Sequence, residues 1–159
     1  MAVKKLENYL EQSKVWYEKI SHPRTYTAQE TAASAHIKGK ELAKSVMIEL
    51  DGEAALAVLP AYLKIDFKRM KQISGAKKIK LALEEDMEDV FPDCTIGAMP
   101  PFGNLYQIPV YADSTLEDDK DIAFNAGSHM ELIKMHFRDF NKLVHPEIHN
   151  IHRHAHYRM

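Results

Sequence analysis

The sequence predicts a single α/β domain of the α+β kind, built around one mixed sheet, and three observations predict it. Helical and strand patterns alternate along the chain. Residues 54–59 are apolar on both faces, as a strand in the middle of a sheet is. The 159 residues, of which 45% are hydrophobic, suit one domain with a sizeable core.

The first segments predict two helices. Residues 4–20 carry an apolar stripe among Lys and Glu, which predicts a helix ended by Ser21-His22-Pro23. Thr27 to Glu30 have the pattern of a capping box, in which the side chains of the first and last residues satisfy free backbone N–H groups. We expect the short Ala-rich helix that follows to end near His36.

A hairpin comes next. Apolar and polar side chains alternate over residues 43–50, which predicts a strand, and Asp51-Gly52 is a strong hairpin signal. Residues 54–59 form the returning central strand. After it, Asp66 caps a helix up to Gly75, with three inward residues, Phe67, Met70 and Ile73. A strand over 79–83 and an acidic helix over 84–90 follow.

Residues 91–103 predict a stiff, mostly apolar loop. Pro100 and Pro101 remove two amide donors and fix two φ angles, while Gly97 and Gly103 permit turns. Such a loop is costly to leave in water, so we expect it to pack against another segment. It is either a structural turn between two strands or the wall of a binding site.

The second half predicts further strands and one helix. Strands are expected over 107–111, 122–125 and 130–135, and a helix over 137–144. Pro109 predicts that the first of these strands lies at an edge or contains a bulge.

The chain after residue 145 predicts a histidine-rich tail, residues 146–159. In and beside it stand five histidines, His145, His149, His152, His154 and His156. Their spacing would suit Zn²⁺ or Ni²⁺ if the segment were helical. The alternative is a disordered end, and we assign no metal ligands.

Composition limits the classes of function. A single cysteine, Cys94, cannot form an internal disulfide, in agreement with a reducing cytoplasm. No run of about 18 apolar residues predicts a membrane span, and residues 1–8 lack the apolar region of a signal peptide. The net charge of −2 argues against general coating of nucleic acid. No phosphate-binding or dinucleotide motif is present, so no cofactor is expected.

Three residues are candidates for chemistry. Cys94 follows Asp93, whose charge would raise the pKa of the thiol, which argues against a nucleophile. Lys44 opens the first hairpin strand, either exposed or facing a pocket, where its ammonium would suit phosphate or carbonyl oxygens. His129 lies in a turn, as a hydrogen-bond donor or acid/base, or as a plain surface residue.

A basic stretch lies between residues 64 and 80, with seven Lys or Arg against one acid, Asp66. Lys64, Lys68 and Lys71 are expected on one helix face. This stretch would contact a phosphate backbone or form a solvated face.

Six separated segments follow one another in an order and spacing that form a recognisable pattern. They are Tyr26 to Glu30, Glu41 to Val46, Ala57 to Ala61, Gly75 to Ile79, Gly97 to Gly103 and Phe124 to His129. In this pattern the chain resembles the YbaK/EbsC family of free-standing aminoacyl-tRNA deacylases, which is similar to the editing insertion domain of bacterial prolyl-tRNA synthetase. The likeness covers about residues 20–145.

The resemblance implies a fold and a site. The fold is a mixed, partly barrel-like sheet with flanking helices, and the deacylase domain spans residues 1–145. The residues implied in catalysis are Lys44, Gly97 and His129. The residues implied in substrate binding are Tyr26, Thr27, Ser45, Ala98, Met99, Pro100, Pro101, Asn125, Gly127 and Ser128.

The resemblance also implies trans-editing, which is hydrolysis of the ester at the 3′-terminal adenosine of a misacylated tRNA. The partners would be aminoacyl-tRNA, expected to be tRNA(Pro), and prolyl-tRNA synthetase. A pocket closed by Met99 and Pro101 would take alanine, serine or cysteine, and His129 after Asn-Ala-Gly-Ser resembles the alanine-editing branch. The alternatives are a non-catalytic module that binds tRNA or a synthetase, and a metal-binding protein that depends on its tail.

Overall fold

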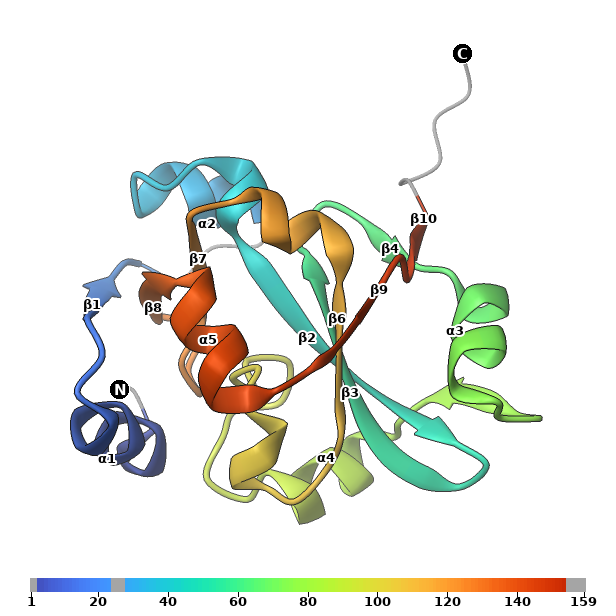
Figure 1. Ribbon diagram of the computed structural model, residues 1–159. Coiled ribbons are helices and arrows are strands. Elements are labelled where there is room, and N and C mark those ends of the chain that lie inside the picture. Colours follow the sequence, from blue (N-terminus) through green and yellow to red (C-terminus); the bar gives the residue numbers. More distant parts are fainter. Residues whose placement is uncertain (1–2, 24–27, 154–159) are drawn as a thin grey trace.

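The computed structural model describes residues 3–23 and 28–153. Figure 1 shows strands at the centre, with α1 and α5 at the left and α3 at the right. The helices are α1 Lys4–Ser13, α2 Ala28–Ser34, α3 Phe67–Ser74, α4 Glu84–Val90 and α5 Phe137–Val144, with 3₁₀ turns η1 Gly39–Glu41, η2 Gly103–Leu105 and η3 Ser114–Asp118. The strands are β1 Tyr17–Ser21, β2 Ala43–Leu50, β3 Glu53–Pro60, β4 Lys64–Ile65, β5 Ile79–Leu81, β6 Val110–Asp113, β7 Asp121–Asn125, β8 Glu131–His136, β9 Glu147–His149 and β10 His152–Arg153.

The strands form mixed, open sheets. The largest has the order β5-β2-β3-β6-β9, in which β2 and β3 are antiparallel while β3, β6 and β9 are parallel. A second sheet has the order β1-β8-β7, and β4 pairs with β10. A parallel bridge between Leu42 and Ala123 joins the two larger sheets. The single mixed α/β domain is confirmed, and across the described residues the sheets do not close into a barrel.

Strand β2 separates two hydrophobic clusters, because successive side chains point to opposite faces of a sheet. Ala43 and Met47 pack in the larger cluster, with Met99 and Phe102. Ile48 packs in the second cluster, beside Val46, against α3 and β4. The face of a β2 residue therefore decides which half of the molecule it contacts.

Two predicted elements are wrong in extent. The helix expected over 4–20 ends at Ser13, and Tyr17–Ser21 pairs with β8 instead, which gives its backbone groups partners that the local sequence does not reveal. The strand expected over 107–111 begins at Val110, because Gln107 has a φ of 63° and Pro109 has no N–H to donate. Thr27, the expected helix cap, lies outside the described residues.

The tail also differs from expectation. Residues 147–149 pair in parallel with β6, and His152 and Arg153 pair with β4. Figure 1 shows this red segment running beside β6 to β4. A disordered end is therefore wrong for these residues, and their extended backbone does not place the histidines at helical spacing. Among the described residues, no group of three or more His, Cys, Asp or Glu is placed to hold a metal ion.

The division into a deacylase domain over residues 1–145 and a separate tail stays a prediction. None of the described helices is long and apolar enough to cross a membrane.

Candidate functional site

The proline-stiffened loop and the turn after β7 are joined by backbone hydrogen bonds. The N–H of Thr95 donates to the carbonyl of Gly127 at 2.8 Å, and the N–H of Gly127 donates to the carbonyl of Ala98 at 2.8 Å. We call residues 95–98 and 125–129 together the backbone wall. The structure therefore brings the loop at Gly97 and the turn at Gly127 together.

Both glycines of the backbone wall have left-handed backbone conformations. Gly97 has a φ of 86°, and a Cβ there would lie 3.4 Å from Cε1 of His129. Gly127 has a φ of 98°, and a Cβ there would collide with Cγ2 of Val3. Only a residue without a side chain fits either position without strain.

The imidazole ring of His129 is held by a hydrogen bond at one of its two nitrogens. Its Nε2 lies 3.0 Å from the carbonyl oxygen of Ile96. A carbonyl only accepts, so Nε2 carries the proton, and Nδ1 of the neutral ring is an acceptor. No hydrogen-bond partner for Nδ1 is found in the described part of the chain. The half-buried ring can therefore accept a proton or hydrogen bond from a ligand.

The loop continues into the core. Ala98, Met99, Pro100 and Pro101 are buried, and the ring of Phe102 packs on Tyr9, Phe124 and Phe140 at centroid distances of 6.1, 5.7 and 5.6 Å. This confirms that the loop packs against another segment. Met99 belongs to the main core cluster, so its role as the wall of an amino-acid pocket stays a prediction.

The backbone donors at the wall are now identifiable. The amide of Gly127 is used by Ala98, and the amide of Ala98 donates to Thr95 at 2.9 Å. Neither amide is therefore free to donate a hydrogen bond to a ligand, so these two amides are excluded as donors to a substrate. Within residues 3–23 and 28–153, the amides of four wall residues donate to no backbone carbonyl: Ile96, Gly97, Ser128 and His129.

Lys44 lies one strand away from Asn125. The parallel bridge joins Leu42 and Ala123, so residues two positions further along each strand lie at the same level and on the same face. These residues are Lys44 and Asn125, and both are half-buried. Asn125 directly precedes the turn that contains Gly127, and a place for Lys44 beside the backbone wall stays a prediction.

Ser45 points to the opposite face of β2 from Lys44. Its Oγ is buried and has no hydrogen-bond partner within the described residues. The two side chains therefore do not approach a ligand from the same face, and a shared role for them stays a prediction.

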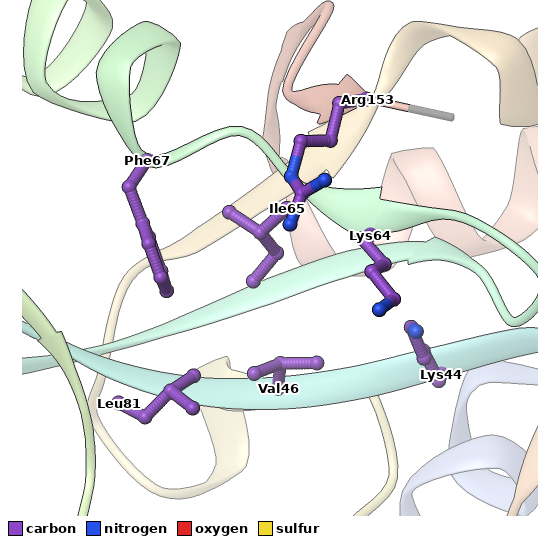
Figure 2. A pocket seen from close by; sticks show the side chains of 7 residues that line it. All are labelled: Lys44, Val46, Lys64, Ile65, Phe67, Leu81 and Arg153. Carbon is purple, nitrogen blue, oxygen red and sulfur yellow. The ribbon is translucent and has the colours of Figure 1, made fainter. Parts of the chain in front are cut away.

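Lys44 also lines a cavity of about 250 Å³ with six other residues, Val46, Lys64, Ile65, Phe67, Leu81 and Arg153. We call this the cation pocket. Figure 2 shows the ammonium groups of Lys44 and Lys64 pointing toward each other. Burial, and then the charge of Lys64, lower the pKa of Lys44 below its usual range. An anion placed there would relieve this repulsion.

The family match covers most of the described chain. The sequence model of a protein family described as the aminoacyl-tRNA editing domain matches residues 22–143 of this chain. The chain belongs to the aminoacyl-tRNA editing domain family. This confirms the family predicted from the sequence.

Relatives of this editing domain include two larger enzymes. It is 29% identical over 111 residues to the proline–tRNA ligase of Staphylococcus saprophyticus, and 28% identical over 132 residues to that of Staphylococcus aureus. These matches cover 68% and 78% of this chain. The editing domain spans about a fifth of each ligase, 19% and 22%.

A solved structure has the same fold. It is described as a candidate trans-editing enzyme for prolyl-tRNA synthetase, and it superposes with a TM-score of 0.84 at 18% identity. The match covers 94% of this chain and 96% of that one.

Cys94 is not activated in this editing domain. Its Sγ lies 3.5 Å from Oδ1 of Asp93 and 3.6 Å from the hydroxyl of Tyr106. Burial raises the pKa of the thiol to about 12, and the charge of Asp93 adds to the rise. A protonated thiol is a poor nucleophile, which agrees with the sequence-based argument.

The structure gathers only some of the predicted site residues. Six of them belong to the backbone wall: Gly97, Ala98, Asn125, Gly127, Ser128 and His129. Tyr26 and Thr27 lie outside the described residues. Sequence reasoning placed Lys64 on a helix and Arg153 in a disordered tail. Both instead line the pocket beside Lys44, and no local pattern signals this, because β4 and β10 are far apart along the chain.

Proposed function

We propose that this editing domain is a trans-acting aminoacyl-tRNA deacylase. The substrate is a misacylated tRNA, tRNA(Pro) in the first instance, and the reaction is hydrolysis of the ester at its 3′-terminal adenosine. The observation that carries the proposal is the backbone wall. A glycine loop is bonded to the His129 turn, one strand away from a lysine whose pKa is lowered by burial.

The protein does not need to supply a strong nucleophile, because an aminoacyl ester is already activated toward hydrolysis. Water attacks the ester carbonyl, helped by the neighbouring ribose hydroxyl, and the protein stabilises the developing negative charge. The amides of Gly97 and His129 are the candidate donors. One well-placed donor to an oxyanion is worth roughly 3 kcal/mol, so such donors supply a large share of a modest acceleration.

His129 and Lys44 have separate roles in this proposal. Nδ1 of His129 accepts a hydrogen bond from the attacking water or from the amino group of the substrate. Lys44 holds the 3′ end through a phosphate or carbonyl oxygen, as a charge beside the wall.

Specificity is proposed to come from the size of the amino-acid pocket. A small amino acid, alanine before cysteine or serine, fits beside the rigid loop that contains Met99 and Pro101. Apolar pockets separate amino acids that differ by one methylene only about 10–200-fold. A synthetase for proline therefore benefits from a separate editing step against smaller amino acids.

The test is a deacylation panel of Ala-tRNA(Pro), Cys-tRNA(Pro), Ser-tRNA and correctly charged Pro-tRNA(Pro). A deacylase releases the amino acid from one or more of the first three and spares the last. A non-catalytic binding module would protect all four esters and would overturn the proposal.

The proposed role of Lys44, which is to hold the 3′ end of the tRNA, can be tested separately. Lys44→Ala should reduce deacylation even at saturating tRNA, while Lys68→Ala on the exposed face of α3 should not. Unchanged hydrolysis by Lys44→Ala would remove Lys44 from the mechanism but not the hydrolysis itself.

A further inference from the structure

Three positively charged side chains reach the cation pocket, and within residues 3–23 and 28–153 none of them is in an ion pair. They are Lys44, Lys64 and Arg153. Other lysines of the domain do have partners, as Lys80 has in Glu49 at 3.6 Å. Three unpaired cations around one small cavity, with no acid among its lining residues, favour an anionic ligand.

The nearest acid in sequence does not neutralise the pocket. Asp66 adjoins Ile65, but its side chain accepts a hydrogen bond from the N–H of Arg69 at 3.1 Å as the N-cap of α3. Its other oxygen lies 3.5 Å from Nε of Arg69. Both carboxylate oxygens of Asp66 therefore interact with Arg69, and Asp66 is not among the residues that line the pocket.

Arg153 is held in place by a buried anchor. Asp113 is fully buried and accepts the N–H of Ile151 at 2.9 Å and Nδ1 of His152 at 2.9 Å. The carbonyl of Ile151 accepts the N–H of Asp66 at 2.8 Å. These bonds set β10 against β4, in the register that pairs Arg153 with Lys64. The third cation is thus positioned by the fold.

The rest of the pocket is apolar and open. Phe67 is 40% exposed and Leu81 is 54% exposed, so both side chains are accessible to a ligand in the pocket. Figure 2 shows Phe67, Val46 and Leu81 forming one side of the cavity, with the cations along the other. An exposed aromatic ring beside positive charges is the combination by which proteins bind single-stranded nucleic acid, with the base stacked on the ring and the backbone held by the charges.

We propose that the cation pocket binds one nucleotide of the single-stranded 3′ end of tRNA, on the 5′ side of the terminal adenosine. Its phosphate lies among Lys44, Lys64 and Arg153, and its base stacks on Phe67. This inference rests on the proposed function, which puts the terminal adenosine beside Lys44. Lys44 lines the pocket, and its strand is bridged to β7, which leads into the backbone wall, so we place both within reach of one strand of RNA.

A free inorganic anion is a weaker fit, because it would leave the apolar side of the pocket in water. A duplex is also a weaker fit, since a cavity of about 250 Å³ is at the small end of ligand sites. The nucleotide is the ligand that uses both halves of the pocket.

The first test measures binding of a fluorescent RNA hexamer ending in CCA by anisotropy, at several salt concentrations. Lys64→Ala and Arg153→Ala should each weaken binding about 5-fold or more and reduce the slope of log K against log salt by about 0.7, the value for one phosphate contact on a single strand. The matched control is Lys68→Ala, which removes the same charge from α3 outside the pocket and should leave the slope unchanged.

The second test separates stacking from charge. Phe67→Ala should weaken hexamer binding on the order of 10-fold, in line with the loss of one stacked base, without changing the salt slope. Phe67→Tyr should retain affinity. Equal losses in Lys64→Ala and Lys68→Ala, or displacement of the hexamer by equimolar pyrophosphate, would overturn the nucleotide assignment.

Deacylation assays distinguish this inference from the proposed function. If the wild type hydrolyses a misacylated tRNA while Lys64→Ala and Arg153→Ala keep its KM, the pocket inference fails and the deacylase stands. If the wild type hydrolyses none of the esters but the salt slopes change as stated, the deacylase fails and the pocket remains an RNA site.

Discussion

The backbone wall and the cation pocket are the two parts of the proposed site, and they are built in opposite ways. The wall consists of main-chain groups, held by reciprocal hydrogen bonds and by two glycines with φ of 86° and 98°. The pocket consists of side-chain charges from β2, β4 and β10. The wall carries no formal charge of its own when His129 is neutral, whereas every charged residue lining the pocket is basic.

This difference separates two tasks. Main-chain donors cannot be lengthened or rotated, so the wall suits a reacting centre that needs fixed geometry. Long cationic side chains adapt, so the pocket suits a flexible strand that needs to be held. We therefore expect changes in the wall to alter kcat, and changes at Lys64 and Arg153 in the pocket to alter KM and salt dependence.

The largest effect should come from Gly127→Ala. The added Cβ would collide with Val3. The alanine would also have to adopt the left-handed φ of Gly127, and this backbone strain alone costs roughly 1–3 kcal/mol. We expect kcat for deacylation to fall at least about 10-fold, the equivalent of 1.4 kcal/mol, with a lower melting temperature. Gly39→Ala is the control, since a Cβ there has nothing within 4 Å. Equal kcat in the two variants would contradict a wall role.

Asp113→Ala should damage the pocket and spare the wall. Loss of the carboxylate leaves the buried N–H of Ile151 without its acceptor, which costs about 1–3 kcal/mol of unfolding free energy. Chemical denaturation would measure this, and hexamer binding should weaken as Arg153 loses its position. Asp118→Ala, an exposed acid nearby, should change neither. A fall in kcat as large as the fall in affinity would contradict the separation of tasks.

The pH dependence of RNA binding should sharpen the comparison further. Burial and Lys64 lower the pKa of Lys44, with Arg153 as the other charge facing the pocket, and a bound phosphate should raise that pKa again. Binding then takes up a proton, so affinity falls as pH rises through the lowered pKa, below the usual 10.5. Lys44→Arg stays charged and should give a flatter profile. Parallel profiles for the two proteins would argue against Lys44 as the titrating group.

The smallest effect should come from Cys94→Ser. With its pKa raised to about 12, the thiol is protonated at neutral pH and has no part in the proposed hydrolysis. We expect deacylation within about 2-fold of wild type and slow labelling by iodoacetamide until the protein is unfolded. Rapid labelling of the folded protein would contradict the assigned environment.

The local sequence determined the elements whose signals are themselves local. The hairpin at Asp51-Gly52, the cap at Asp66 and the helix over 137–144 were all predicted correctly, because turn chemistry, capping and helical periodicity act within a few residues. The same reasoning failed at Tyr17–Ser21, whose strand depends on β8. It also failed at Phe67, predicted to face inward but 40% exposed.

The family was also accessible from the sequence, and so were the two segments of the candidate site at Gly97 and His129, because both are short contiguous motifs. The tertiary structure alone decided that Lys64 and Arg153 face Lys44. Strand pairing between distant segments, fixed by the buried Asp113, brings them together. Such pairing depends on which backbone partners remain free once the core has packed, and no short stretch of residues contains that information.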